Sequence, residues 1–362
     1  MLSSLKILDR YIIRKFLSTF FFAIGLIIAI SIVFDISEKL DDFLDKKAPL
    51  GEIIFDYYLN FIPYFANLFS PLFIFISVIF FTGRMAANTE IIVILNSGIS
   101  FKRFLQPYLI TAIFLSVASY FLGAYVIPQS NETRLEFENR YIKNPYVLKT
   151  RNIHRQISPG EYIYFENYNT IDKVGYLFSL EKFDAGRMKY KMLAERIVWD
   201  TSSSKWTIEN YYIREIENEK EKLTYGQRLD TILSFYPEDF SKRINHIQSM
   251  SNPELKDHIN EEKMRGSGTT VFAEIELYKR TSYPFATIIL TLIGVALSSR
   301  KVRGGIGLQI GMGILLSFTY IMFMQVSSTF ATNGTTPAIV AVWIPNIVFL
   351  LIALYLVRKA PA

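Results

Sequence analysis

The side chains that most often carry enzyme chemistry are few and scattered in this chain. Its histidines, His154, His246 and His258, lie far apart in sequence, and the absence of cysteine excludes disulfides, thiolate metal sites and cysteine nucleophiles. There is no phosphate-binding glycine loop with its lysine, and no His-Glu-x-x-His zinc motif. The glycine groups at 266–268 and 304–307 are typical of hinges or loop–helix junctions. We therefore expect no catalytic residue, no metal, no cofactor and no ATP hydrolysis by this chain.

Residues 84–100 have the composition of a short binding helix. Their apolar centre is too short to cross a membrane, but Asn88 or Thr89 can cap a helix there, and Glu90 complements the positive end of the helix dipole. Residues 96–98, Asn-Ser-Gly, can end that helix. Its apolar face needs a partner, which is either another protein or the membrane surface along which a connector helix lies. The residues alone leave both alternatives open.

Six uncharged apolar stretches must position these segments. As helices, all of them are long enough to cross roughly 30 Å of hydrocarbon, and a helix satisfies its own backbone in lipid. A soluble core of six wholly apolar helices is the alternative that we reject. The sequence thus predicts an α-helical membrane protein with three transmembrane helices on each side of a polar block. The stretches are residues 16–34, 57–83, 104–126, 281–299, 304–332 and 337–357.

The basic residues of the short connections indicate the orientation. If the apolar stretches alternate in direction, all of these residues fall on one side, which is cytoplasmic by the positive-inside rule. Both termini are then cytoplasmic, and the block at 128–270 is extracytoplasmic. The net charge of +6 is distributed by membrane side, so nucleic-acid binding is not expected. The basic residues are Lys6, Arg10, Arg14, Lys15, Arg84, Lys102, Arg103, Arg300, Lys301, Arg303, Arg358 and Lys359.

The polar block has the pattern of β structure. Alternating or aromatic-rich runs are separated by turn residues, as in an antiparallel sandwich or open barrel. Helical signals return only at the end of the block, where Asn252-Pro253-Glu254 begins a helix with Leu255, His258 and Ile259 on one face, and Gly266 ends it. The predicted strands are 162–168, 175–183, 189–199, 205–215 and 222–235, and the predicted turns are 158–160, 184–186 and 200–204.

Several motifs, in this order and spacing, resemble the lipopolysaccharide-export permease family, LptF and LptG. The resemblance covers the whole chain, and its N-terminal signature and length favour the LptG-like member. It implies a membrane half at 1–127, a periplasmic β-jellyroll-like domain with a linker helix at 128–270, and a second membrane half at 271–362. The motifs are Leu8-Asp9-Arg10-Tyr11-Ile12, Pro63, Pro71, Thr89-Glu90-Ile91 with Ser97-Gly98, Pro337, and Trp343-Ile344-Pro345.

The function implied by the resemblance is that of a transport subunit in a bacterial inner membrane. Such permeases pair with a sister permease, sit on a dimeric cytoplasmic ABC ATPase, extract lipopolysaccharide from the membrane, and pass it through the jellyroll to a periplasmic bridge of similar jellyrolls. The segment 84–100 matches the coupling helix, which favours ATPase docking, with Glu90 contacting a basic residue of the ATPase. The coupling residues that we expect are Arg84, Thr89, Glu90, Ile91 and Leu95.

The resemblance also implies lipid-binding residues. Family members carry a basic residue that matches Arg280, whose guanidinium could hold a lipid A phosphate or carboxylate; Lys279 precedes it. The alternative is an interfacial anchor paired with Glu274 or Glu276. Family lysines at the outer end of the first segment have Lys39 as their main equivalent here, with Lys46 and Lys47 further on.

Small residues in the fifth segment are implied to line a gate between the two permeases. Gly307, Gly311 and Gly313 have the spacing of close helix packing, which could equally occur within one subunit.

Two other functions are considered. A mechanotransmission permease for lipoprotein release or efflux would have one membrane segment before its large domain and three after it, whereas three and three are predicted here. A membrane scaffold or receptor would need a cytoplasmic signalling domain, for which no predicted cytoplasmic segment is long enough.

Overall fold

The computed structural model describes residues 6–142, 151–217, 220–237, 240, 244–264, 270–300 and 305–360, without the side chains of 244, 245, 305 and 306. These residues form two compact units. One is drawn from Met1–Ile142, Gln248–Asn252 and Glu274–Ala362, and the other from Lys143–Ile247 and Pro253–Ala273. The units are described separately below.

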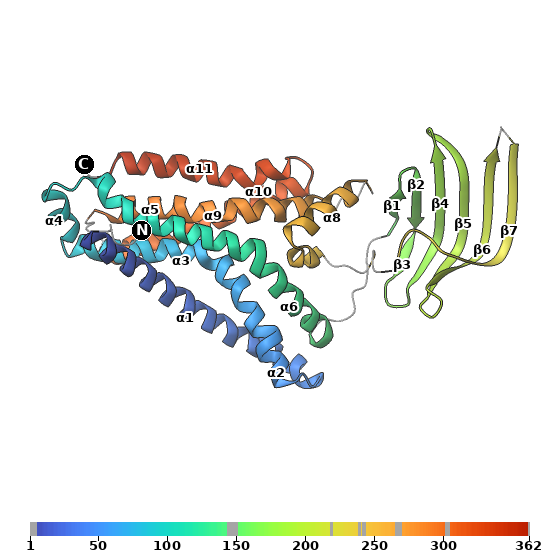
Figure 1. Ribbon diagram of the computed structural model, residues 1–362, viewed down its shortest axis with the longest axis horizontal. Helices are drawn as coiled ribbons and strands as arrows, with labels where there is room; N and C mark the ends of the chain where they lie inside the picture. The colour runs from blue at the N-terminus through green and yellow to red at the C-terminus, as the bar shows by residue number, and fades with distance from the viewer. Residues whose placement is uncertain are drawn as a thin grey trace. The chain divides into compact units, whose positions relative to one another are not determined.

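The first unit contains six helical segments that are long and apolar enough to span a membrane (Figure 1). Three precede and three follow the β strands in sequence, which confirms the predicted layout. Its elements are α1 (Ile7–Asp45), α2 (Leu50–Glu52), η2 (Ile53–Tyr58), α3 (Leu59–Ala87), α4 (Glu90–Asn96), α5 (Phe101–Phe121), η3 (Leu122–Val126), α6 (Ile127–Tyr141), α9 (Thr270–Ser298), α10 (Gly305–Thr332) and α11 (Ala338–Arg358).

The helices pack around α3, which contacts α1, α6 and α10, while α10 also contacts α11. One buried cluster joins α1, α3, α4 and α5 around Phe16 and Phe104, and a second joins α3, α9, α10 and α11 around Phe75 and Tyr320. The outer faces stay apolar, with residues such as Phe22 highly exposed, as expected of surfaces that face lipid. Figure 1 shows α4 at the end of this unit where both ends of the chain lie.

Several helices extend beyond the predicted apolar stretches. α1 continues to Asp45 through the acid-rich sequence that follows residue 34, and α9 begins eleven residues before Thr281, at Thr270. The prediction that helical structure returns only at the end of the polar block is wrong, because α6 continues α5 through the π-helical η3. The buried face of α6 includes Asn131, Arg134 and Glu138, so a search for apolar periodicity does not detect it.

The second unit contains an antiparallel sheet of seven strands, which confirms an inserted β domain. Six strands follow each other as neighbours in the order β1-β2-β4-β5-β6-β7, and β3 pairs with β4. The predicted strand 162–168 is divided into β2 and β3. β1 was not predicted, because His154, Arg155 and Gln156 interrupt the alternation of apolar and polar residues. The strands are β1 (Ile153–Ser158), β2 (Glu161–Phe165), β3 (Asn167–Asn169), β4 (Val174–Asp184), β5 (Arg187–Asp200), β6 (Lys205–Glu217) and β7 (Lys220–Thr231).

The hairpin between β5 and β6 confirms the turn predicted at 200–204. The Asp200 carboxylate accepts hydrogen bonds from the Ser202 backbone N–H at 2.9 Å and from the Ser203 hydroxyl at 2.7 Å. The Ser202 hydroxyl donates a further hydrogen bond that contributes most, and with the other two it stabilises the charged carboxylate and lowers the pKa of Asp200 to about 2.

One face of the sheet is apolar and is covered by the segment that follows β7. Phe235 and Phe240 pack on Phe165 and are each 2 % exposed. The Trp206 indole Nε1–H donates to the Phe235 carbonyl at 2.9 Å, which holds the segment at this position. The predicted last strand, 222–235, is therefore too long: β7 ends at Thr231, and the residues beyond it fill the apolar face instead of extending the ladder.

Two short helical elements follow the sheet in sequence, η4 (Ile244–Ser249) and α8 (Asn252–Met264). α8 begins at the predicted residue, and Leu255 and Ile259 are buried on one face as expected. The predicted helix end at Gly266, the glycine group 266–268, and Lys301, Arg303 and Gly304 lie outside the described residues.

Candidate functional site

The start of α1 positions the α4 segment through three neighbouring residues of the Leu8-Asp9-Arg10-Tyr11-Ile12 motif. The buried Asp9 carboxylate accepts two hydrogen bonds from the Arg103 guanidinium, at 2.7 and 2.6 Å. The Tyr11 hydroxyl donates to Glu90 at 3.2 Å, and Ile12 is fully buried. The motif therefore fastens the N-terminal end of α1 to α5 and to the start of α4.

The start of α4 differs from the predicted cap. Thr89 adopts a left-handed conformation with φ +62°, and no side chain caps the helix; the Thr89 hydroxyl bonds to the Asn88 carbonyl instead. Glu90, the first helical residue, also accepts from the Asn88 amide at 3.3 Å. The predicted end is confirmed, because α4 stops at Asn96 and Gly98 has φ +87°.

The surface of α4 is only partly the surface predicted for coupling. Arg84 and Thr89 are exposed, whereas Ile91 is 1 % exposed and Leu95 is half-buried, both against the chain's own core. The exposed apolar residues are Ile92 and Val93, at 50 % and 65 %. The sequence could not distinguish the two faces of a helix of seven residues that is apolar on both.

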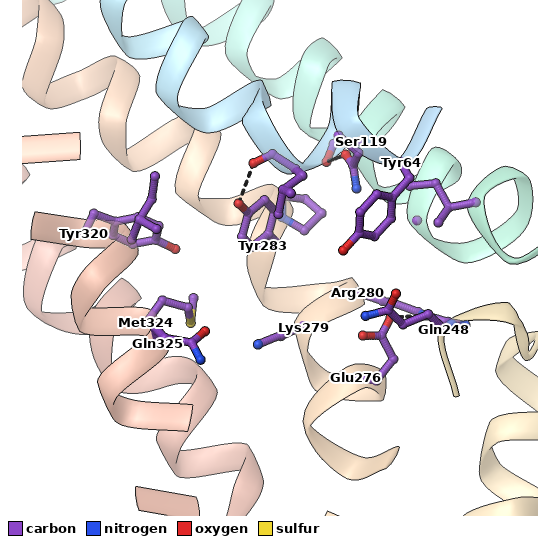
Figure 2. A pocket seen from close by; sticks show the side chains of 16 residues that line it. Tyr64, Ser119, Gln248, Glu276, Lys279, Arg280, Tyr283, Tyr320, Met324 and Gln325 are labelled. Atoms are coloured by element: carbon purple, nitrogen blue, oxygen red, sulfur yellow. Dashed lines mark hydrogen bonds and ion pairs between the residues drawn. The ribbon is translucent and has the colours of Figure 1, made fainter. Parts of the chain in front are cut away.

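A cavity of about 210 Å³ lies in the half of the helical unit away from α4, and Figure 2 shows its lining. The second half of α10 and the first halves of α3 and α9 form most of it. The lining combines hydroxyl, amide and charged groups with apolar side chains, as in sites that bind an amphipathic ligand. The polar residues of the lining are Tyr64, Asn67, Ser119, Gln248, Glu276, Lys279, Arg280, Tyr283, Tyr320 and Gln325.

Arg280 is the most buried charged residue of this lining, with 6 % of its surface exposed. Its Nε donates to Glu276 at 3.3 Å, and its Nη1 donates to the Asn252 side-chain oxygen at 2.8 Å. Its Nη2 is buried and has no hydrogen-bond partner among the residues that the structure describes. Because an arginine stays charged in proteins, a buried guanidinium with an unsatisfied nitrogen can bind an anionic group. Pairing with Glu276 was one of the predicted alternatives.

Lys279 lines the same cavity but approaches it from another direction. In Figure 2 its side chain extends towards Met324 and Gln325 of α10, whereas Arg280 extends towards Gln248. The two adjacent cations therefore reach different parts of one cavity, as expected for neighbours separated by about 100° around a helix.

Tyr64 and Gln248 were not predicted from the sequence. Arg134 lies over the Tyr64 ring, with 4.9 Å from its guanidinium carbon to the ring centroid. Gln248 belongs to η4, which follows the β strands in sequence, so only the folded chain brings it to the cavity. The available signal was the presence of polar side chains, Tyr64 and Asn67 among them, within the apolar stretch 57–83.

Lys39, the third predicted lipid contact, lies near the end of α1 in a separate cluster. Its ammonium group donates to Asp35 at 2.5 Å and to the Tyr57 hydroxyl. Tyr58 donates to the same carboxylate at 3.1 Å. The first two hydrogen bonds use two of the three N–H donors of the Lys39 ammonium group.

The three predicted glycines of α10 differ in their surroundings. A Cβ at Gly313 would lie 2.3 Å from Ile79 Cδ1, so this glycine permits close packing of α10 on α3. At Gly307 and Gly311 a Cβ would meet no atom within 4 Å. Gly313 therefore packs within the subunit, while the other two lie on a face that the described residues leave uncovered.

This difference gives a matched test. Gly313→Leu is expected to lower the stability of the purified chain in detergent by roughly 1–3 kcal/mol through overpacking against Ile79. Gly311→Leu, two residues away, should leave the thermal unfolding midpoint of the single chain unchanged. Equal midpoints for the two variants would contradict the close approach of α10 to α3.

The described residues contain no group of three His, Asp or Glu side chains placed to hold a metal ion. What they offer instead is a cavity with two cations, one carboxylate and several hydroxyl and amide groups. This arrangement suits reversible binding of an anionic, partly apolar molecule.

Comparison with known proteins gives three related findings. The family model described as "Lipopolysaccharide export system permease LptF/LptG" matches residues 10–359. The lipopolysaccharide export system permease protein LptG of Escherichia coli K12 is 18 % identical over 362 residues, which covers 98 % of each chain. An uncharacterized protein of Aquifex aeolicus is 23 % identical over 307 residues, covering 80 % of this chain and 81 % of that protein.

Proposed function

Because this chain belongs to the family of lipopolysaccharide export system permeases LptF/LptG, we propose that it is the permease subunit of an ABC transporter that extracts lipopolysaccharide from the bacterial inner membrane. The observation that carries the proposal is the extent of the family match, residues 10–359, which includes both membrane halves and the β domain. The lipid would then pass through the β domain to a periplasmic bridge, and a separate cytoplasmic ATPase would supply the energy.

The cavity around Arg280 supports an anionic lipid as the cargo. Lipid A carries phosphates on an apolar body, and the cavity combines two cations with apolar groups of α3 and α10. A phosphate could satisfy the free Nη2 of Arg280, with Lys279 as a second cation.

The α4 segment is the proposed contact with the ATPase. In the orientation inferred from the basic loop residues, both termini and α4 are cytoplasmic and the β domain is periplasmic. Glu90 and the exposed Ile92 and Val93 would then form an acidic and apolar surface for a groove of the ATPase. Arg84 and Thr89 flank this surface and are exposed.

The face of α10 with Gly307 and Gly311 is the proposed contact with a sister permease. Two glycines four residues apart allow the backbones of two membrane helices to approach closely. Within the part of the chain that the structure describes, neither glycine is covered. On this proposal Gly311→Leu should reduce recovery of the sister permease in pull-downs, while Gly313→Leu acts on the stability of the chain itself.

The apolar face of the β sheet is the proposed path of the acyl chains. A photo-crosslinking residue at Ile163 or Met192, which are buried on that face, is expected to capture lipopolysaccharide only while ATP is hydrolysed. Tyr162 and Leu193 point to the opposite face by strand alternation and serve as matched controls. Equal capture at the inward and outward positions, or capture that does not depend on ATP, would favour a purely structural sheet.

A lipoprotein-release permease is less well supported. That architecture would have one span before the large domain, whereas the described residues hold three before and three after it.

Reconstitution tests the proposal directly. The chain would be purified in complex with its ATPase and sister permease, placed in liposomes that contain lipopolysaccharide, and mixed with a soluble periplasmic acceptor. ATP-dependent transfer of lipopolysaccharide to the acceptor is expected. Failure of an ATPase or a second permease to co-purify, together with no transfer, would contradict the proposed function.

A further inference from the structure

The β sheet carries a continuous row of side chains on the face opposite its apolar one. Residues that lie directly opposite each other on paired strands share one face of a sheet. The row crosses six neighbouring strands from β1 to β7, and aromatic rings lie at both of its ends. In order across the sheet its members are His154, Tyr164, Ser179, Leu193, Tyr212 and Tyr225.

A second row lies on the same face, two residues further along each strand. The row between these two belongs to the apolar face, where Ile163, Leu180 and Met192 are buried. The two rows form one surface, which we call the outer face, and the proposed path of the acyl chains does not use it. The members of the second row are Gln156, Tyr162, Glu181, Lys191, Arg214 and Leu223.

The outer face is hollowed over β1, β2, β4 and β5. The pocket there has a volume of about 440 Å³, within the range of small-molecule sites. Ser179, a small residue between Tyr164 and Leu193, lies in this pocket. The Tyr164 hydroxyl donates to Asn152 Oδ1 at 2.9 Å, and the Tyr164 ring lies 4.6 Å from the His154 ring between centroids. These contacts hold the aromatic wall of the pocket in place.

Tyr212 and Tyr225 form a second aromatic site at the other end of the row. Their rings stack with centroids 5.9 Å apart, and Tyr225 is 72 % exposed. The carboxamide residues Asn210 and Gln227 line the same part of the surface. Three strand spacings, roughly 14 Å, separate β2 from β6. Two aromatic sites at this separation suit a chain molecule better than a single small ligand.

The charges of the outer face are paired with one another. Lys191 forms an ion pair with Glu181 at 2.7 Å, and Arg214 forms one with Glu221 of β7. Paired charges attract a polyanion such as a nucleic acid weakly, because its binding depends on cations that face phosphates. An uncharged sugar chain fits this surface better. Its rings have C–H faces that pack on aromatic rings, and its hydroxyls bond to carboxamides, carboxylates and phenols.

We propose that the outer face of the β sheet binds the glycan strands of the cell wall, a polymer of N-acetylated amino sugars. The inference goes beyond the proposed function and takes from it only the periplasmic location of the β domain. The sugar chain of the cargo is the less suitable occupant, because the acyl chains of the same lipid are proposed to lie on the opposite face of the sheet.

Co-sedimentation of the full transporter complex in nanodiscs with purified, protein-free cell-wall sacculi tests the proposal. The wild-type complex should bind saturably, and a soluble linear pentamer of N-acetylglucosamine should compete. The double variant Tyr162→Ser, Tyr225→Ser removes one exposed ring from each end of the outer face. It is expected to bind about 10-fold more weakly or worse, while ATP-dependent lipid transfer stays unchanged.

Tyr236→Ser is the matched control. Tyr236 is 52 % exposed, between Tyr162 at 42 % and Tyr225 at 72 %, but it belongs to the segment after β7 that covers the apolar face. This variant should bind the sacculi as the wild type does.

The outcomes separate this proposal from the proposed function. Absence of wild-type binding, or equal binding by the double variant, would overturn the glycan site without bearing on lipid transfer. If lipid transfer fails while the sacculi are bound, the proposed function fails and the glycan site stands. Competition by single-stranded oligothymidylate alone would assign the face to nucleic acid, and competition by the polysaccharide cleaved from lipopolysaccharide alone would assign it to the cargo; each result contradicts the proposal.

Discussion

Replacing Glu90 by arginine is expected to abolish lipopolysaccharide export while the chain still folds in the membrane. Glu90 is the first residue of α4, and its carboxylate is the acidic group of the surface that we propose docks on the ATPase. A reversed charge would repel the basic groove that the carboxylate pairs with, and a like-charge contact at an interface costs several kcal/mol. Co-purification of the ATPase and lipid transfer in proteoliposomes are the measurements.

The structure supplies a control for this experiment, because Glu90 also has a partner within the chain. Tyr11→Phe removes the hydrogen bond to Glu90 but keeps the carboxylate and the ring. We expect Tyr11→Phe to retain the ATPase and most of the transfer. If it were as inactive as Glu90→Arg, Glu90 would act by fixing α1 to α4; if Glu90→Arg recovered the ATPase at wild-type yield and activity, the coupling role would be wrong.

The second large effect is expected at Arg280. Arg280→Ala should weaken lipopolysaccharide binding by about 30-fold or more, the equivalent of roughly 2 kcal/mol, because it removes the most buried cation of the cavity. ATP hydrolysis should continue without export. The amount of lipid that co-purifies with the complex and the ratio of lipid transferred to ATP hydrolysed measure the two effects.

Lys279→Ala is the matched comparison, because the lysine lines the same cavity from the adjacent position. Its effect should be clearly smaller, since the ammonium group offers a single point of charge where the guanidinium offers a fork of parallel donors. Equal losses for the two variants, or none for either, would reduce both residues to interfacial anchors and leave Lys39 as the better candidate for lipid binding.

The membrane architecture could be predicted from the sequence because lipid restricts the possible structures. In hydrocarbon the backbone N–H and C=O groups of a segment must bond to each other, so each long apolar stretch is predicted to form one helix. The same logic failed for α6, whose buried face contains Arg134 and Glu138 at 3.7 Å and whose helical period is therefore not one of hydrophobicity. A helix whose buried face consists of paired polar side chains can be recognised only from the structure, which shows the partners of those side chains.

The candidate site was predictable in part for a related reason. Arg280 was predicted because the resemblance places a basic residue of the family at this position, and its carboxylate partner was one turn away in sequence. Its bond to Asn252 spans 28 residues, and the approach of Gln248 to Tyr64 in one cavity spans 184. No local pattern carries such contacts, and at α4 the pattern indicated a helix without indicating which of its apolar faces is buried.

The packing of Phe235 and Phe240 on the sheet affects the solubility of the β domain. Burial of each aromatic side chain contributes roughly 1.5–3 kcal/mol, and the two rings cover Phe165, which would otherwise be exposed to water. This cover reduces the apolar surface through which copies of the domain could aggregate. If acyl chains bind to this face, they would replace Phe235 and Phe240 as the apolar groups that cover it. Binding and release of the lipid would then change the solubility of the domain little.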